Sequence, residues 1–214
     1  NRVQLGDIDN MSDAGVYGYT DYSNTHSTTL EVGSKNVITI SRNINYNEIN
    51  RKVWIDWNID GDFNDSNELV LQHGSNSSLS YTDTFKVPHS ATTGGSRMRI
   101  GASFNGQAND PCGPNNFGEF EDYRVFIIPD VSAPEITLLD QDTVYLERCD
   151  NTYSDAGATA VDNVDGDITS SIIMTGNIDP SVVDTYYLKY NVQDASNNQA
   201  EEEIRVVIVK EDAI

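Results

Sequence analysis

The sequence predicts an all-β protein built from two tandem antiparallel β-sandwiches, the second of them immunoglobulin-like. Short apolar stretches rich in β-branched and aromatic residues recur between clusters of turn residues, as is typical of antiparallel sandwiches. No stretch of the sequence shows the helical periodicity of an amphipathic helix. Pro129 and Pro134 interrupt the pattern and indicate a short linker, because proline is excluded from central strands. We therefore expect domains at 1–129 and 133–214.

The first domain is expected to contain a series of strands separated by turn residues. The expected strands are residues 35–40, 52–57, 68–72, 81–87 and 97–104, each of which alternates or is rich in β-branched and aromatic side chains. A loop of Ser, Thr and Gly at 90–95 separates the last two of them. An apolar run at 123–128 ends the domain.

The second domain also shows short strand patterns. The expected strands are residues 136–139, 142–146, 185–192 and 203–209. The last two are long runs of aromatic and β-branched residues, which favour extended structure. Short strands over roughly 80 residues are typical of an immunoglobulin-like sandwich.

The chain is strongly acidic, with 13 Lys and Arg against 34 Asp and Glu and a formal net charge of −21. Such a field repels phosphate backbones, so nucleic acid is not expected as a partner. No run of about 18 apolar residues is present, so no membrane span is expected.

Low hydrophobicity with high charge is also typical of disorder. However, 11 Tyr, 6 Phe and 2 Trp indicate a folded chain, and we expect bound cations to neutralise many of its carboxylates.

The segment 56–68 carries oxygen-bearing side chains at alternate positions, with Gly61 after the third of them. This spacing matches the core of calcium-binding loops, in which alternate side chains point inward and glycine permits a sharp turn. Glu68 falls one position later than the bidentate ligand of a helical EF-hand, and a strand precedes the loop, so we expect a Ca²⁺ loop on a β-hairpin. The expected ligands are Asp56, Asn58, Asp60, Asp62 and Glu68. The alternative is an Asx-rich turn solvated by water.

A second acidic loop at 162–167 lies in the second domain, with Asp155 before it and Asp194 far along the chain. Because loops from distant strands meet at one end of a sandwich, Asp194 can approach this loop. The looser spacing leaves a metal site and a plain polar turn as open alternatives. The candidate ligands are Asp162, Asp165, Asp167 and Asp194.

Catalysis is not expected from this chain. Its histidines are His26, His73 and His89, and none lies in a zinc-protease motif or beside a nucleophile elbow. Carboxylates are numerous enough that composition alone does not exclude a glycosidase-like pair. The densest groups of carboxylates, however, lie in the two acidic loops.

Four segments of the first domain resemble the GEVED domain. Residues 118–123 match the signature of that family, with Phe120 where the family has Val, and segments 54–63, 97–99 and 111–113 also fit. The resemblance implies an accessory β-sandwich of a large secreted protein of the Bacteroidota, in many cases exported by the type IX system. The parent proteins in that family include metallopeptidases, polysaccharide-degrading enzymes and adhesins, so the resemblance fixes no ligand.

The second domain resembles a bacterial Ig-like module that occurs in tandem arrays and in a pesticidal crystal toxin. Segments 155–160, 162–169 and 194–198 carry the resemblance. Asn197 and Asp184 replace glycines that are usual in the family, and the first change is mild because Asn tolerates left-handed backbone geometry. The resemblance implies no chemistry.

The extracellular context implied by both families permits a disulfide between Cys112 and Cys149. The two cysteines lie in different expected domains, so a bridge would lock the domains together. The alternative is two free thiols.

In the segment 118–123, carboxylates are expected to pair with Arg97 and Arg99 on a neighbouring strand. The alternative there is a cation bound by Glu119 or Glu121.

Aromatic rings and amides supply candidate ligand-binding residues, because sugar rings stack on flat aromatic faces and amides bond their hydroxyls. Trp54 and Trp57 are expected on opposite faces of one strand, with one in the core and the other as a platform near the calcium loop. The candidates are Trp54, Trp57, Tyr17, Tyr19, Tyr22, Asn105, Gln107 and Asn109. The alternative for each ring is ordinary packing.

We therefore expect a secreted or cell-surface, non-catalytic calcium-binding module that binds extracellular polysaccharide for a secreted enzyme and contacts neighbouring domains of the same chain. Two alternatives stay open: a calcium-stiffened spacer or adhesion segment, and a substrate-holding accessory domain of a secreted peptidase. A polyanionic glycan would meet the net charge of −21 and would need a cation bridge or a basic patch. Arg97, Arg99 and Lys86 are candidates for such a patch.

Overall fold

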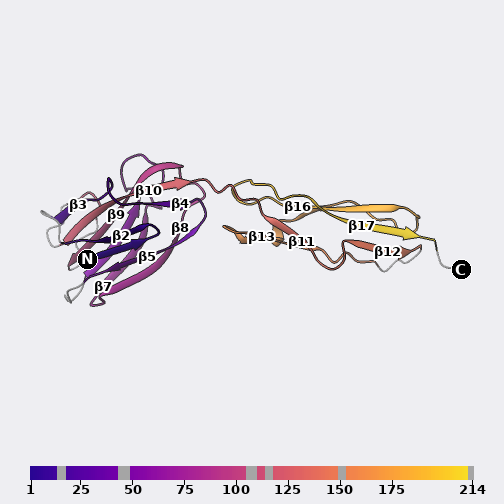
Figure 1. Ribbon diagram of the computed structural model, residues 1–214, viewed down its shortest axis with the longest axis horizontal. Helices are drawn as coiled ribbons and strands as arrows, with labels where there is room; N and C mark the ends of the chain where they lie inside the picture. The colour runs from indigo at the N-terminus through magenta and orange to yellow at the C-terminus, as the bar shows by residue number, and fades with distance from the viewer. Residues whose placement is uncertain (14–17, 43–48, 105–109, 114–117, 149–152, 212–214) are drawn as a thin grey trace. The chain divides into compact units, whose positions relative to one another are not determined.

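The computed structural model describes residues 1–13, 18–42, 49–104, 110–113, 118–148 and 153–211. The chain folds as two compact units, Asn1–Pro129 and Asp130–Ile214 (Figure 1). Asp130, which the sequence assigned to the linker, belongs to the second unit, because its buried carboxylate joins those of two loops there. Among the described residues, no helix is long and apolar enough to cross a membrane.

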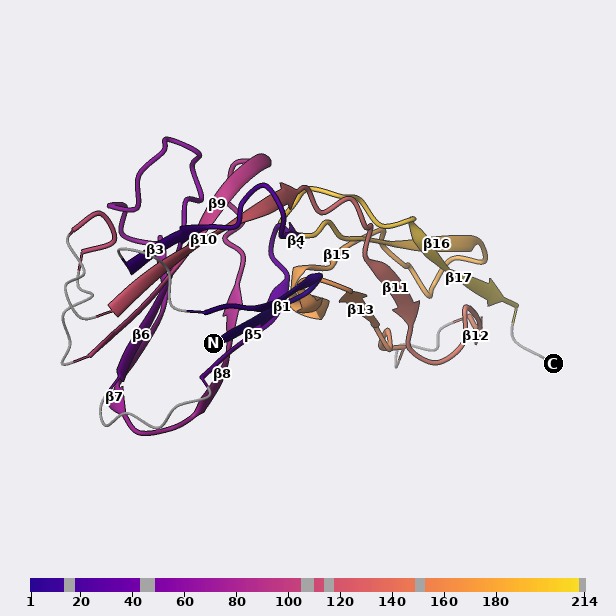
Figure 2. The same cartoon turned by 60° about the vertical axis from the view of Figure 1, so that its left-hand side comes forward.

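The first unit is a sandwich of two sheets, which form separate layers in the turned view of Figure 2. One sheet has the strand order β2-β1-β5-β8, and all its pairs are antiparallel. Its strands are β1 (Arg2–Leu5), β2 (Ile8–Met11), β5 (Lys35–Ser41) and β8 (Ser80–Lys86).

The other sheet of the first unit has the order β3-β10-β9-β6-β7, with β4 also paired to β10. Its strands are β3 (Tyr19–Asp21), β4 (Ser27–Glu31), β6 (Ile49–Ile55), β7 (Leu69–Asn76), β9 (Gly94–Phe104) and β10 (Gly118–Ile128). Contrary to the expected all-antiparallel arrangement, β3 and β4 run parallel to β10. They are two pieces of one edge strand, interrupted by a turn at 22–26.

Strand β10 shows how the sandwich buries one face of a sheet. Tyr123, Val125 and Ile127 are buried, whereas Phe126 and Ile128, which alternate with them, are exposed. The core between the sheets also contains Val3, Leu5, Ile8, Ile38, Ile40 and Phe85 from one sheet and Val53, Ile55, Met98 and Ile100 from the other.

The second unit is a smaller sandwich of a three-stranded and a four-stranded sheet, with orders β11-β13-β14 and β12-β17-β16-β15. The first sheet contains β11 (Glu135–Leu138), β13 (Ala158–Asp162) and β14 (Gly166–Asp167). The second contains β12 (Thr143–Glu147), β15 (Ile173–Thr175), β16 (Thr185–Asn191) and β17 (Glu203–Lys210). The pair β12–β17 is parallel, and a short 3₁₀ turn, Thr169–Ser171, follows β14.

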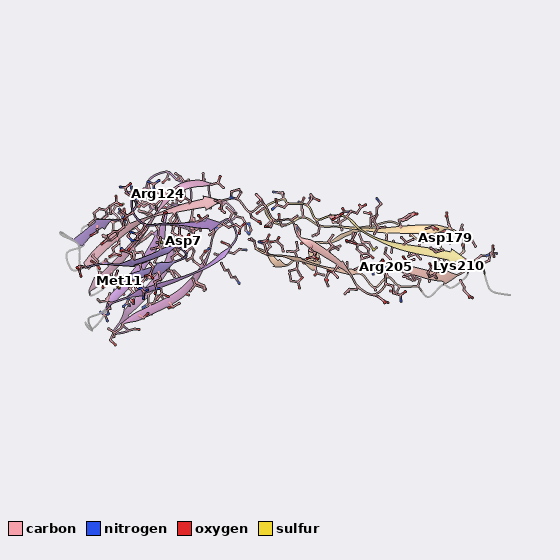
Figure 3. The ribbon with its side chains drawn as sticks, viewed as in Figure 1. Asp7, Met11, Arg124, Asp179, Arg205 and Lys210 are labelled. Atoms are coloured by element: carbon pink, nitrogen blue, oxygen red, sulfur yellow. The ribbon has the colours of Figure 1, made fainter. Side chains whose placement is uncertain are left out.

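A buried ion pair ties together the second unit. Arg205 of β17, labelled in Figure 3, is 1% exposed and donates hydrogen bonds to the Asp155 carboxylate and to the carbonyl oxygens of Leu139 and Gln141. The Tyr190 hydroxyl donates to Asp155 at 2.5 Å. Burial alone would raise the pKa of Asp155, but the hydrogen bonds from Tyr190 and Arg205 hold it below its usual value. Asp155 therefore bonds residues of the sandwich strands and is not a ligand of the acidic loop that follows it.

Candidate metal centres

The first acidic loop joins β6 to β7. Strand β6 ends at Ile55, two residues before its predicted end, and the Asp56 carboxylate accepts the backbone N–H groups of Asp60 at 3.2 Å and Gly61 at 3.1 Å. Ile59 and Gly61 have φ values of 59° and 93°, in the left-handed region. These two residues tighten the loop, which brings Asp60 back over Asp56.

Three carboxylates meet in this loop. Asp56, Asp60 and Glu68 each offer an oxygen atom, and these atoms lie within 4.8 Å of one another. Asp56 is 5% and Glu68 1% exposed, whereas Asp60 faces solvent. Like charges at this separation repel each other by roughly 3–4 kcal/mol at an effective dielectric constant of 20. A hard divalent cation, which takes six to eight oxygen ligands, would convert that repulsion into attraction.

Glu68 is held for this role by the backbone. The N–H groups of Trp57 and Asp65 each donate to one of its carboxylate oxygens at 3.2 Å. Burial first, and then the nearby charges of Asp56 and Asp65, raise the pKa of Glu68 despite those hydrogen bonds. A cation would reverse this effect, because it favours the ionised carboxylate.

The other two predicted ligands of this loop are Asn58, which carries an amide and contacts Asp60, and Asp62, which lies outside the three-carboxylate group. Asn58 is exposed, and its side-chain amide donates to Asp60 at 2.9 Å and to Asp65 at 2.6 Å. Asp62 is exposed and accepts the backbone N–H of Asn64 at 2.8 Å. The carboxylates of Asp56, Asp60 and Glu68 therefore meet at one point, and the Asn58 side chain lies beside them on Asp60.

The second acidic loop contributes to a separate group in the second unit. Asp162 and Asp194 come together there, as the loop argument expected, and Asp130 completes the group. Asp165 instead accepts the backbone N–H of Ala195 at 2.9 Å, and Asp167 accepts that of Thr169 at 3.0 Å. The first bond joins two loops, the second is local to the turn after β14, and neither Asp165 nor Asp167 belongs to the three-carboxylate group.

Comparisons with known families identify both units. Residues 50–126 match the model of the GEVED domain, and residues 136–209 match that of the Ig-like domain of bacterial surface proteins. The chain is a GEVED domain followed by a bacterial surface Ig-like domain. Both are accessory modules and not catalytic families. The second match is consistent with an extracellular or cell-surface location.

Comparison with curated proteins gives no match to this chain. A lipoprotein of Bacteroides thetaiotaomicron, BT2262, is 21% identical with a TM-score of 0.34; the match covers 38% of this chain and spans only 39% of the lipoprotein. The fibronectin(III)-like modules of Clostridium thermocellum CbhA are 13% identical over 87% of this chain and 90% of theirs, with a TM-score of 0.29. The sialic acid binding region of a Streptococcus sanguinis SK1 adhesin is 10% identical over 99% of this chain and 78% of its own, with a TM-score of 0.28.

Both tryptophans of the GEVED domain are buried, so the expectation of an exposed platform is wrong. Trp54 is 2% exposed and packs against Phe63 and Phe120 on the outer face of the sheet. Trp57 is 5% exposed, packs in the main core and donates its indole N–H to the Asn67 carbonyl at 3.1 Å. The loop residue Phe63 folds back over the outer face, which covers the side that alternation had left for solvent.

The tyrosines of the same domain are also engaged. Tyr22 stacks on Tyr123 with ring centroids 5.6 Å apart and packs against the core. Tyr19 is 42% exposed, but its hydroxyl donates to Asp122 at 2.9 Å.

Of the remaining candidates, Tyr17, Asn105, Gln107, Asn109 and Cys149 lie outside the described residues. Cys112 is exposed and forms no disulfide with any residue that the structure describes.

The expected pairing of arginines with the GEVED signature is confirmed at Asp122. Arg99 binds this carboxylate with two hydrogen bonds of 2.7 Å, and Arg97 lies 3.5 Å from it. The Asp122 side chain is fully buried, so the two guanidinium groups neutralise a charge that water does not reach. Glu121 instead accepts the Tyr123 hydroxyl at 2.8 Å.

A hollow of about 220 Å³ lies beside the first acidic loop. Asp56, Gly61 and Phe63 of the loop form one part of its wall, and Arg97 and Arg124 also line it. Arg124, labelled in Figure 3, is exposed on β10. Arg97 and Arg99 do not form the basic patch with Lys86 that the sequence suggested, because both point to Asp122 while Lys86 ends β8 in the opposite sheet.

Proposed function

We propose that this chain is a non-catalytic accessory segment of a bacterial surface or secreted protein, in which bound Ca²⁺ stiffens the GEVED domain. The observation that carries the proposal is the meeting of Asp56, Asp60 and Glu68 within 4.8 Å, two of them buried. A calcium-stiffened spacer or adhesion segment fits this geometry better than a sugar platform, because Trp54 and Trp57 are both buried.

Calcium fits the donor set of this loop. The donors that meet there are carboxylate oxygens, and no described His or Cys joins them. Hard cations such as Ca²⁺ select oxygen ligands, whereas Zn²⁺ prefers nitrogen and sulfur. Two left-handed residues, Ile59 and Gly61, produce the tight loop that such a site requires.

Terbium luminescence tests the proposal at this one site. Both tryptophans of the chain, Trp54 and Trp57, lie in the GEVED domain, and the Trp57 backbone N–H bonds Glu68. Excitation at wavelengths that only Trp absorbs should therefore sensitise Tb³⁺ bound in this loop, and Ca²⁺ should displace it.

The matched variants are Asp60→Asn and Asp62→Asn, two neighbouring exposed aspartates of which only Asp60 belongs to the three-carboxylate group. Asp60→Asn should abolish the sensitised emission, whereas Asp62→Asn should retain it. Emission that survives Asp60→Asn unchanged, or that Ca²⁺ does not displace, would contradict the proposal.

A second candidate function is recognition of an acidic polysaccharide in the hollow beside the loop. Arg97 and Arg124 line that hollow together with Asp56, so a sugar carboxylate could contact both guanidinium groups and a cation at the loop. This arrangement would let a chain of net charge −21 bind a polyanion.

Affinity electrophoresis of the full chain across neutral, sulfated and uronic polysaccharide gels tests this candidate. We expect retardation on the uronic gel with Ca²⁺, and its loss in Arg124→Gln. Arg2→Gln is the control, because Arg2 is exposed and paired with Asp9 on the other sheet. If no gel retards the chain, polysaccharide recognition is contradicted and only the spacer function remains.

A further inference from the structure

We propose that Asp130, Asp162 and Asp194 form a second divalent-cation site, with calcium chemistry, in the Ig-like domain. The site lies entirely within this unit and does not depend on the loop of the GEVED domain. It includes a residue, Asp130, that the sequence pattern assigned to the linker.

The three carboxylates come from well-separated parts of the domain. Asp130 precedes β11, Asp162 ends β13, and Asp194 lies in the turn that follows β16. Each offers one oxygen atom, and these atoms lie within 4.8 Å of one another. All three residues are buried, with exposed fractions of 4%, 3% and 5%. Three buried like charges at this distance require a counter-charge.

The hydrogen bonds of the group point to a ligand. Asp130 Oδ2 and Asp162 Oδ2 are buried and have no hydrogen-bond partner. Buried carboxylate oxygens in native proteins nearly always have a partner, so two such atoms in one cluster need an explanation. A cation coordinated by both atoms supplies it.

The other oxygens of the same carboxylates are already held by backbone N–H groups. Ser132 donates to Asp130 Oδ1 at 3.0 Å, and Val164 donates to Asp162 Oδ1 at 2.7 Å. Asn198 donates its backbone N–H to Asp194 Oδ1 at 2.8 Å. These bonds fix each carboxylate in place, and for Asp130 and Asp162 they leave the second oxygen free for the ion. This is the arrangement by which outer contacts orient metal ligands.

Asn198 also links two of the three segments directly. Its side-chain amide donates to the Asp130 carbonyl at 3.2 Å and to Asp194 Oδ2 at 2.8 Å. This contact holds the segment at Asp130 against the turn after β16 before any ion binds. The cation would add the β13–β14 hairpin to the same point through Asp162.

An all-oxygen set with three carboxylates favours Ca²⁺ over transition metals. The ion would join the beginning of the Ig-like domain to two of its loops, so it would rigidify the segment 130–134. The alternative occupant is a buried water, which can donate to both unpartnered oxygens but leaves the three charges uncompensated.

Site-resolved NMR of the full chain tests the inference. In a Ca²⁺ titration of the ¹⁵N-labelled protein, the amide signals of Ser132, Val164 and Asn198 should shift together, because each bonds a carboxylate of this group. The amides of Asp60 and Gly61 report on the other site in the same spectra. Failure of one site is therefore distinguishable from failure of the other.

The decisive variant is Asp130→Asn, which keeps the size of the side chain and removes one charge. It should weaken Ca²⁺ binding at Ser132, Val164 and Asn198 by about tenfold or more, because calcium affinity follows the charge of the ligand set. The response of Asp60 and Gly61 should not change.

Asp167→Asn is the matched control, because Asp167 lies in the same hairpin but outside the three-carboxylate group. It should bind Ca²⁺ like the wild type. Without Ca²⁺, Asp130→Asn should show well-dispersed spectra, since it removes repulsion. Amides that do not respond to Ca²⁺ in the wild type, or an unchanged affinity in Asp130→Asn, would overturn the inference.

Discussion

At the scale of single residues, the fate of each carboxylate depends on the groups that face it. Asp122 and Asp155 are both held by arginines, Arg99 and Arg205, and serve as structural anchors. Glu68 instead accepts the backbone N–H groups of Trp57 and Asp65, and its pKa is raised mainly by burial. Residue type alone does not distinguish these cases, because an aspartate in a loop and an aspartate facing a buried guanidinium look alike in sequence.

The Arg205–Asp155 pair provides a stability prediction. Arg205→Met should lower the free energy of unfolding of the Ig-like domain by about 3–5 kcal/mol, because it leaves the buried part of Asp155 and several carbonyls without their donor. Arg148→Met should cost about 1 kcal/mol or less, because the Arg148–Glu211 pair is exposed. Urea denaturation followed by tyrosine fluorescence measures both. Equal costs for the two variants would contradict the role assigned to Arg205.

The same pair predicts a pH dependence. Because the folded pKa of Asp155 lies below its usual value of 3.8, the ionised form favours folding. Its contribution is complete above pH 3.8 and is lost as the pH falls through the lower folded pKa. In chelator, the stability difference between wild type and Asp155→Asn should be constant near neutral pH and narrow below pH 3.8. A difference that widens on acidification would contradict this assignment.

At the scale of elements, the sequence predicts the long strands and two short ones, β11 and β12, but misses most of the other short strands. The patterns at 35–40, 81–87, 97–104 and 203–209 correspond to β5, β8, β9 and β17. Short or edge strands such as β3 and β14 carry too few residues for a period to appear. The hairpin loop at 56–68 was predictable because its spacing is local, whereas Asp130 was not, because it meets its partners only through the tertiary fold.

The β6–β7 loop depends on backbone geometry as much as on its carboxylates. A Cβ at Gly61 or at Gly74 would meet nothing within 4 Å, but only Gly61 has a left-handed φ, of 93°. Gly61→Ala should therefore destabilise the GEVED domain by about 1–2 kcal/mol and weaken Ca²⁺ binding. Gly74→Ala, in β7, should stabilise it slightly or leave it unchanged. Calorimetry of both variants checks the contrast, and equal effects would show that backbone conformation is not the cause.

At the scale of the whole molecule, the net charge of −21 is partly gathered into two groups of three carboxylates. The groups lie in different folding units, Asn1–Pro129 and Asp130–Ile214. Each unit therefore has its own need for a counter-charge, and we expect calcium to stabilise both. The match of the second unit to the Ig-like domain of bacterial surface proteins is consistent with an extracellular or cell-surface location, and extracellular modules commonly bind calcium.

Removal of calcium should accordingly lower the melting temperature of the chain. At a calcium concentration about a hundredfold above the dissociation constant, each site adds about 2.7 kcal/mol to the free energy of unfolding. Scanning calorimetry with millimolar Ca²⁺ and with excess chelator measures the shift. Identical midpoints in the two conditions would show that neither carboxylate group depends on an ion.

The most direct measurement is a crystal structure of the chain grown with millimolar CaCl₂. We expect a cation bonded to Asp56, Asp60 and Glu68, with oxygen distances of about 2.3–2.6 Å and further backbone or water ligands. Well-ordered water at that position, with the three carboxylates bonded only to protein and solvent, would contradict the account.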